Sequence, residues 1–483
     1  MNLIKDVLNF LFIFQNAQKK PKIFKGWVIV TYLFGGWLWG NFFSWGKFPI
    51  HFHDWAEVNI GRLAYLRDAI LKGALPLHAA GTAHLRNGTD QILSVPDLVL
   101  SPQLILMRWM DIEMFVFINT LFLYTIAFIG LLWILRRHKL SPIIFSTLVF
   151  LFNFNGHIIS HLGIGHITWW SYFLFPFLYI QIIRLLEDSD HTWKWVFQTS
   201  ILLFLIFLQG GYHHYVWSLM FLGVLALVAW KHTWAIFKVL VFSNLLSMIR
   251  LLPPAQLVNN FEPEFLSGYP KLSNVFSAIL FERAPQDSLP FLNFDSNLGY
   301  WEFDLFIGKF GALIIFFGFL LWLISLRKNQ PVSYILIPMI VLSVLSIGNL
   351  YEPFTRIPFP LIAGERVSSR FIILPFLFAV FFSLTSLQDW LNRIIKPLIL
   401  YPVFLAMNLL ILFDISKHVF LWKIENIFPH FPYTPVDKTL KAISNHADPT
   451  YTTFLIIGAF VTLLSMTVLF ILTRHESKKN LNP

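Results

Sequence analysis

The sequence predicts an all-α fold, a polytopic transmembrane helical bundle. Hydrophobic residues make up 56% of its 483 residues and charged residues only 13%. Soluble domains contain roughly 45–50% hydrophobic residues and about 25% charged residues. Apolar runs recur along most of the chain, and many approach the length of about 20 residues that crosses a hydrocarbon core. These observations exclude a soluble protein and indicate one membrane domain.

The N-terminal segment, residues 1–25, is expected to lie in the cytoplasm or at its membrane interface. A short apolar run, Leu8–Phe14, precedes the basic cluster at 19–22, and no small-residue cleavage site follows it. This pattern is typical of an interfacial helix and differs from that of a cleaved signal peptide.

Apolar segments predict about twelve spans within a single transmembrane domain, residues 26–473. The predicted spans lie near 26–45, 114–135, 141–154, 166–184, 194–209, 212–230, 234–249, 306–326, 333–347, 370–387, 397–414 and 453–473. Several contain proline, which neighbouring helices in a bundle can accommodate. No repeat or Gly/Ser linker divides them.

Basic residues predict the orientation. Lys and Arg gather in the N-terminal segment, in alternate short connectors and in the tail at 474–483. By the positive-inside rule, both termini are then cytoplasmic. Four long loops are predicted to lie outside, at 46–113, 250–305, 348–369 and 415–452.

The net charge of +10 does not indicate a nucleic-acid partner. The basic residues are spread among short connectors and form no basic face, which nucleic-acid binding would require. The chain has no cysteine, so disulfides, thiolate metal sites and a cysteine nucleophile are excluded.

An amphipathic helix is predicted in the first outer loop. Apolar residues recur at helical spacing from Ile60 to Leu71, among charged residues, and Gly73 and Pro76 follow as helix-stop signals. We expect this helix to lie along the outer membrane surface.

Two acids of the same loop, Asp54 and Glu57, are candidate catalytic residues. They follow the first span, where a lipid head group would be within reach. A carboxylate there could act as general base on an acceptor hydroxyl or hold a divalent cation. Asp54 could equally be the N-cap of a solvated helix.

Histidines near two outer helix boundaries are accessory candidates. His157 and His161 are four residues apart, His166 follows them, and His213 lies in the segment 209–215. Such histidines could bind a metal or a phosphate oxygen, or simply hydrogen-bond to backbone and interfacial water. The sequence requires no cofactor, although a divalent cation is possible, and the metal is undetermined.

Three arginines are candidates for binding a donor phosphate. Arg366 and Arg370 are four residues apart near the outer end of the tenth predicted span, and guanidinium groups bind phosphate in a bidentate manner. Arg250 lies at the end of the seventh, where ionisable residues usually face the bundle interior. Glu302 could pair with these arginines, and a purely structural role in ion pairs is the alternative.

Several enzyme classes lack their motifs. The sequence has no phosphate-binding Gly-Lys-Ser/Thr loop, dinucleotide fingerprint, His-Glu-x-x-His or Gly-x-Ser-x-Gly elbow. ATPase, zincin and serine hydrolase activities therefore have no support.

The order of these segments resembles that of the GT-C superfamily of polytopic glycosyltransferases, and within it the bacterial YfhO-type membrane proteins. The matching segments are Asp54 with Glu57, Leu71–Leu77, Gly81-Thr82, Ser101-Pro102, Gly156–His166, Leu251–Gln256 and Arg366–Phe371. The resemblance implies a bacterial plasma membrane protein that takes a sugar from a polyprenyl-phosphate donor, transfers it at the extracytoplasmic face, and uses the first-loop acid as catalytic base.

The acceptor would be a glycan, a lipid or a protein, and membrane lipids surround the chain. Two other functions also require cationic residues beside an apolar groove. One is a non-catalytic flippase or transporter of a lipid-linked saccharide, which predicts polar residues along a path across the spans. The other is a polymerase or ligase of surface glycans, which concentrates its arginines in a late loop. The long first loop favours the transferase.

Overall fold

The computed structural model describes residues 2–80, 90–94, 97–255, 265–287, 298–326, 331–356, 365–393, 397–436 and 440–481. Parts of the four predicted outer loops lie outside these ranges. Gly81-Thr82 and Gln256, the last residue of Leu251–Gln256, carry part of the family resemblance and also lie outside the described ranges.

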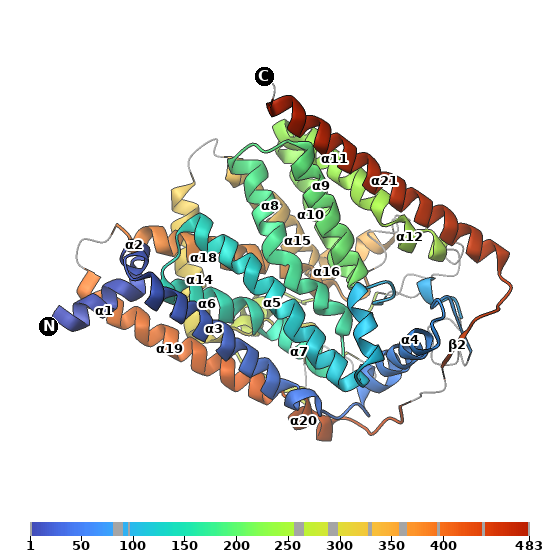
Figure 1. The fold of residues 1–483 in the computed structure, drawn as a ribbon. Coiled ribbons are helices and arrows are strands. Elements are labelled where there is room, and N and C mark those ends of the chain that lie inside the picture. Colours follow the sequence, from blue (N-terminus) through green and yellow to red (C-terminus); the bar gives the residue numbers. More distant parts are fainter. Residues whose placement is uncertain are drawn as a thin grey trace.

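Helices build almost all of the described chain (Figure 1). The first part contains α1 (Asn2–Phe12), α2 (Phe14–Gln18), α3 (Pro21–Phe42), α4 (Ile60–Lys72), α5 (Ile112–His138), α6 (Pro142–Asn153), α7 (Gly156–Ile164), α8 (Phe175–Glu187), α9 (Trp193–Leu208), α10 (Tyr212–Val228), α11 (Thr233–Leu246) and α12 (Met248–Leu251). The second part contains α13 (Leu272–Leu280), α14 (Gly308–Ser325), α15 (Leu336–Leu345), α16 (Gly348–Tyr351), α18 (Ile373–Leu391), α19 (Pro397–Leu421), α20 (Ile424–Ile427) and α21 (Pro449–Leu481).

Short helical turns and one small sheet connect these helices. These turns include the π-helical turn η2 (Trp55–Asn59) and the 3₁₀ helices η7 (Ile167–Leu174), η10 (Tyr300–Glu302), η13 (Ser368–Ile372) and η14 (Phe428–His430). The all-α prediction omitted the sheet, in which β1 (His78–Ala80) pairs antiparallel with β2 (Lys441–Ile443). Its strands are too short for sequence alternation to reveal them.

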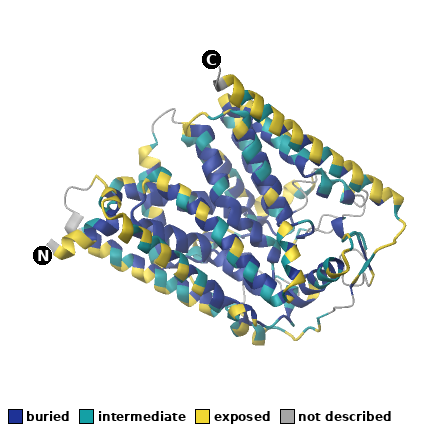
Figure 2. Cartoon of the chain, viewed as in Figure 1, coloured by how far each residue is buried: buried dark blue, intermediate teal, exposed yellow. Residues whose placement is uncertain are grey.

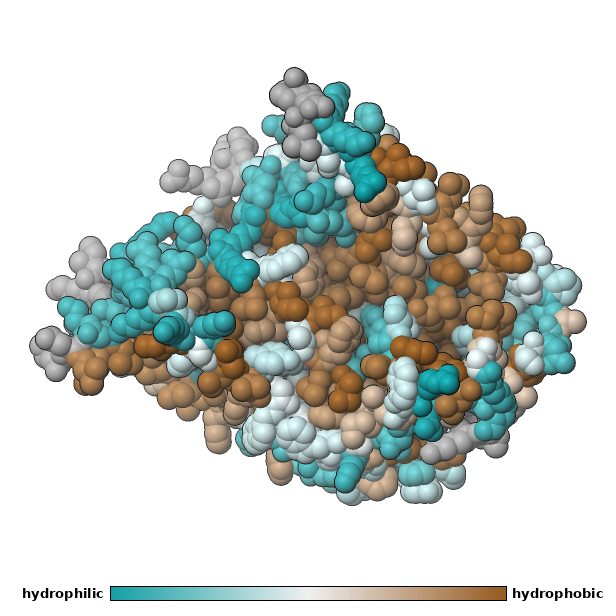
Figure 3. Space-filling model, viewed as in Figure 1, coloured by the Kyte–Doolittle hydropathy of each residue, from teal (hydrophilic) through white to brown (hydrophobic). Residues whose placement is uncertain are grey.

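The packing matches that of a membrane bundle. In Figure 2 the central helices α5 to α10 and α18 are largely buried, whereas α19 and α21 keep an exposed face at the periphery. That face is apolar on α21, where Ile456, Phe460 and Leu463 are exposed. Figure 3 shows a broad apolar surface between two more hydrophilic regions. A hydrocarbon solvent explains why apolar side chains are left uncovered there.

Within the part of the chain that the structure describes, seven helical segments are long and apolar enough to cross a membrane, or eight if a bent pair is counted as one span. The pair is α10 with the segment 230–246, which meet at 113°. Helices α9 and α15 are apolar but shorter. The integral membrane assignment is therefore supported by the helices, while the count of twelve spans remains a prediction.

Several boundaries differ from those predicted. Helix α3 begins at Pro21, before the predicted start of the first span at 26, and α19 continues to Leu421, beyond its predicted end at 414. Polar residues such as Lys22 and Asp414 lie inside these helices. A span predicted from hydropathy ends at such residues, although the helical backbone hydrogen bonds continue past them.

The largest correction concerns residues 155–165, which were expected to form an outer connector. They form α7, a buried helix that joins α6 in one candidate segment, Pro142–Ile164. Asn155 caps α7 by accepting a hydrogen bond from the Ile158 N–H, and Gly165 ends it in a left-handed conformation with φ of 103°. In the sequence, Asn155 and Gly165 look like loop residues, because asparagine and glycine are common both at helix caps and in loops.

Segments near both ends of the chain are tied to connectors of the bundle. The Gln388 side chain donates to the Phe12 carbonyl and accepts from the Ser141 N–H. The Trp193 N–H donates to the Glu476 carboxylate in α21. Each contact joins segments that the basic residues place inside, while the side of the membrane they face remains a prediction.

The absence of cysteine allows a direct test of orientation. We expect Ser444→Cys, beyond β2, to react with an impermeant maleimide on intact cells, and Lys139→Cys, after α5, to react only after permeabilisation. Both positions are exposed. The opposite pattern of labelling would invert the topology and with it the assignment of the outer face.

Candidate functional site

The candidate site is a network of ionisable side chains around the indole ring of Trp169, in η7. The Arg370 guanidinium lies over this ring, 4.9 Å from its centroid. Five histidine rings also surround it, with centroid distances from 4.3 to 6.2 Å, namely His157, His161, His166, His213 and His214. Helices from the first, middle and late parts of the chain therefore converge on one indole.

Asp54 forms one end of the network. Its Oδ2 lies 2.9 Å from His166 Nε2, and His166 Nδ1 lies 2.6 Å from His161 Nδ1. The Asp54 side chain is 23% exposed and that of His161 is fully buried. The chain of contacts thus runs from an accessible carboxylate into the bundle interior.

Local packing fixes Asp54 beside His166. Gly165 lies against the backbone of Trp55, so closely that a Cβ there would be 2.6 Å from the Trp55 nitrogen. The Trp55 indole donates to the Gly163 carbonyl at 2.9 Å, and the Asn59 amide donates to the carbonyls of Gly165 and Asp54. The turn that carries Asp54 is therefore bound to the end of α7.

Glu302 and Arg370 form the buried centre of the network. The Arg370 Nε and Nη2 donate to the two Glu302 oxygens at 2.7 and 2.6 Å, a bidentate geometry. His161 Nε2 lies 4.0 Å from Glu302 and connects this pair to the Asp54 end. Glu302 therefore forms one of the acid–arginine pairs that its sequence position suggested.

Glu365 and His213 form the other end. Glu365 accepts hydrogen bonds from the Trp217 indole at 3.1 Å and contacts Arg370 at 3.4 Å and His213 at 2.8 Å. Burial opposes ionisation of Glu365, but His213 and Arg370 outweigh it and hold its pKa below the ordinary value. The His213 side chain is 31% exposed, so this end is also accessible.

This low pKa predicts an acid-dependent loss of stability. A carboxylate whose pKa is lowered on folding stabilises the native state above its unfolded pKa, near 4.5, and ceases to do so as the pH falls through the lower native value. We expect the stability difference between wild type and Glu365→Gln to be largest above about pH 5 and to shrink in acid. Unfolding in detergent from pH 7 to 3 measures it, and a constant difference would contradict the prediction.

The remaining predicted site residues have different surroundings. His157 belongs to the network, where it is buried and accepts a hydrogen bond from the Trp169 indole at 2.9 Å. Glu57 is exposed to solvent. Arg250 donates to the backbone carbonyls of Asp97 and Val99, at 3.3 and 2.7 Å, and so holds a loop in place.

Arg366 and Arg370 do not share a helical face. Arg370 belongs to η13, but Val367 is extended and forms a bridge with Ser267. The Arg366 carbonyl accepts a hydrogen bond from the Leu266 N–H at 2.8 Å. The four-residue spacing suggested a shared face, but pairing with residues a hundred positions away keeps this segment non-helical.

The N-cap interpretation of Asp54 is not supported by the geometry. Asp54 precedes η2, yet its side chain makes no capping hydrogen bond to that turn and contacts His166 instead. The neighbouring His53 packs edge-on against Trp301 with ring centroids 4.8 Å apart. Burial lowers the pKa of His53, and the Asp54 charge opposes this shift.

Sequence reasoning missed three residues of the site. Trp169 had no distinguishing pattern among 18 tryptophans, and Glu365 was not among the predicted site residues. His214 was also overlooked, although it stands beside His213 and lies within hydrogen-bonding distance of Ser171, at 2.5 Å. A dense set of His, Trp and Gly at helix boundaries was the available signal.

Three residues of the network have the composition of a metal site. The potential ligand atoms of His161, His166 and Glu302 all lie within 4.8 Å of one another. Two imidazoles and a carboxylate suit a divalent cation such as Zn²⁺, and a carboxylate on a ligating histidine, as Asp54 is on His166, is a common support for such sites.

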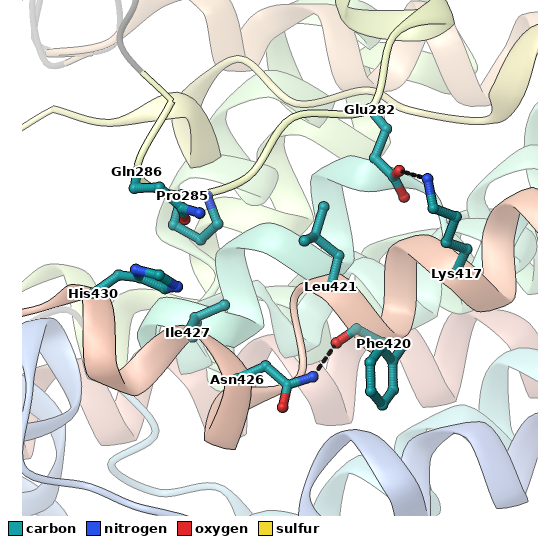
Figure 4. Close-up of a pocket in the computed structure, with 9 residues that line it drawn as sticks. All are labelled: Glu282, Pro285, Gln286, Lys417, Phe420, Leu421, Asn426, Ile427 and His430. Atoms are coloured by element: carbon teal, nitrogen blue, oxygen red, sulfur yellow. Dashed lines mark hydrogen bonds and ion pairs between the residues drawn. The ribbon is translucent and has the colours of Figure 1, made fainter.

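Two cavities lie near these elements. The larger, about 700 Å³, is almost entirely apolar and lies between α13, α14, α15 and α18; Ile307, Lys309 and Ile372 are part of its wall. The smaller, about 320 Å³, is shown in Figure 4, where His430 lies across from the Glu282–Lys417 ion pair. The large cavity adjoins the chain segments that carry Glu302 and Arg370.

Comparisons of the chain with protein-family models, curated proteins and solved structures gave no match.

Proposed function

We propose that the chain is a membrane glycosyltransferase that moves a sugar from a polyprenyl-phosphate donor to an acceptor at the outer face. The observation that carries the proposal is the position of Asp54. It is a partly exposed carboxylate, held by His166 at 2.9 Å, at the end of a buried network that contains Arg370. General-base catalysis requires such a carboxylate close to an acceptor hydroxyl.

In the proposed reaction Asp54 accepts the proton of the acceptor hydroxyl. The acceptor oxygen forms a bond to the anomeric carbon while the bond from that carbon to the phosphate oxygen breaks, so the configuration inverts. His166 acts as a positioning residue, because its contact fixes the direction of the Asp54 carboxylate. Glu57 is exposed and has a supporting role at most.

The departing phosphate requires cations. Arg370 uses Nε and Nη2 for Glu302, and its Nη1 makes only a 3.4 Å contact with Glu365. Because a guanidinium has five N–H groups, one remains on each terminal nitrogen for a phosphate oxygen. Lys309, in the wall of the apolar cavity, is a second cation that sequence reasoning did not select.

The apolar cavity supports a lipid-linked donor. Its polar lining is negligible, and Ile372 in its wall follows Arg370 by two residues. An isoprenoid chain buried there gains hydrophobic free energy while its phosphate remains near the guanidinium.

The position of Lys238 favours transfer over transport. This residue lies inside the predicted span 234–249, and a crossing path would need further polar groups beside it. Its Nζ instead lies 4.5 Å from the ring centroid of Trp193, at the start of α9. A cation packed on an aromatic ring near a helix end is a structural interaction.

Reconstituted protein tests the proposal. Vesicles that contain the purified chain and a polyprenyl-phosphate hexose with a labelled sugar are incubated with acceptor membranes. Covalent transfer of the label supports a transferase. Movement of the intact donor between leaflets without transfer would overturn the proposal and favour the flippase.

A further inference from the structure

A second cluster of metal-ligating side chains lies away from the Trp169 network. His78 is the first residue of β1, Asp90 lies beside that strand, and His446 follows β2. The potential ligand atoms of these three residues all lie within 4.8 Å of one another. The sequence gave no sign of this cluster, because 356 positions separate Asp90 from His446.

The small sheet brings the three side chains together. The Ala79 N–H donates to the Asp90 carbonyl at 3.0 Å on one side of β1. On its other side, His78 pairs with Ile443 of β2, three residues before His446. The backbone therefore fixes His78 between the two segments that supply the other side chains.

The distances suit a small cation. Asp90 Oδ2 lies 2.7 Å from His446 Nε2 and 3.4 Å from His78 Nδ1, and the two imidazole rings stack with centroids 4.0 Å apart. Two ligands about 2.0–2.1 Å from a tetrahedral zinc ion are separated by roughly 3.3 Å. Small side-chain movements would therefore place all three around one ion.

The burial of His78 points to a ligand. Its side chain is 5% exposed, and its Nδ1 is buried without a hydrogen-bond partner although it faces Asp90. An unsatisfied buried nitrogen is costly unless something binds it. The side chains of Asp90 and His446 are 27% and 33% exposed, so an ion can enter from solvent.

We propose that His78, Asp90 and His446 form a zinc site that fastens the first outer loop to the segment before α21. Two imidazoles and one carboxylate favour Zn²⁺ over Mg²⁺ or Ca²⁺, which prefer oxygen ligands. Water completes the tetrahedron. Two hydrogen bonds join the same segments beside the site, from Gln91 to Asp448 at 2.6 Å and from the Leu93 N–H to the Tyr451 hydroxyl at 3.0 Å. The ion therefore has a structural role, in which it cross-links these segments.

Zinc binding by the purified full-length chain tests this site. Protein stripped with a chelator is equilibrated with buffered Zn²⁺, and bound zinc and the unfolding temperature are measured. We expect zinc to raise the unfolding temperature by on the order of 5 °C. His446→Ala and the milder Asp90→Asn should each lose one bound zinc and this shift. Co²⁺ in place of zinc should give the strong visible absorption of a tetrahedral site in wild type, and this absorption should decrease in both variants.

Two controls identify which residues hold the ion. His430→Ala removes an exposed histidine outside the cluster and should keep both the zinc and the shift. His166→Asn alters the other potential metal cluster and should leave the shift in place. The proposal is overturned if wild type gains no zinc-dependent shift, if Asp90→Asn and His446→Ala retain it, or if His166→Asn alone abolishes it.

Discussion

Asp54→Asn is expected to reduce sugar transfer by about 10²–10⁴-fold, the usual contribution of a general base. The substitution removes the proton acceptor and nearly preserves the shape of the side chain. The asparagine oxygen can still accept a hydrogen bond from His166, which lies 2.9 Å from the carboxylate. Folded protein and donor binding should therefore persist, and initial rates of transfer from labelled polyprenyl-phosphate hexose would measure the loss.

Glu57→Gln is the matched control. It removes a carboxylate of the same loop, three positions along the chain, that is exposed to solvent. We expect transfer to fall by less than about ten-fold, because Glu57 has only a supporting role. If Glu57→Gln abolishes transfer while Asp54→Asn is active, the two assignments are reversed. A silent Asp54→Asn would favour a structural role, in which the side-chain oxygen only accepts the hydrogen bond from His166.

Arg370→Gln is expected to destabilise the protein by about 3–5 kcal/mol, because removal of one member of a buried ion pair leaves the other charge unpaired. The Glu302 carboxylate is almost completely buried and receives two hydrogen bonds from Arg370. Glu365 loses a contact at the same time. Unfolding by heat or denaturant in detergent would measure the change.

The double variant Glu302→Gln/Arg370→Gln separates pairing from packing. It removes both charges, so it should be more stable than Arg370→Gln alone. Arg370→Lys keeps the charge and loses the planar fork, so transfer should fall even where folding survives. Additive effects in the double variant would show that the pair is not coupled, and full transfer by the lysine variant would remove Arg370 from the phosphate site.

Composition and local pattern predicted the helices well. The apolar runs at 114–135, 306–326 and 370–387 predicted the long segments observed at 112–138, 308–325 and 368–391, because a helix that crosses a hydrocarbon core needs about 20 consecutive apolar residues. The stop signal at Gly73 was also read correctly, since α4 ends there in a left-handed conformation with φ of 64°. A glycine C-cap acts over a few neighbouring residues and is therefore visible in the sequence.

The candidate site was predicted only in part. Ionisable residues next to predicted spans are candidates for a site in such a chain, so Asp54, His166 and Arg370 could be selected by type and position. The sequence could not show that Glu302 binds Arg370 in a bidentate manner, nor that Trp169 lies among them. Those contacts depend on how η7, η10 and η13 pack, and packing is decided by the whole set of side chains together.

The sequence by itself thus determined a membrane protein built of helices, the positions of several long apolar helices, and which polar residues were worth testing, because hydropathy and helix signals act over a few neighbouring residues. Only the tertiary structure decided which of those residues meet. It brought Asp54 to His166, kept Arg366 off the helical turn that carries Arg370, left Glu57 exposed, buried α7, and joined His78 to His446. Contacts between residues hundreds of positions apart depend on the packing of entire helices, and local sequence patterns contain no information about that packing.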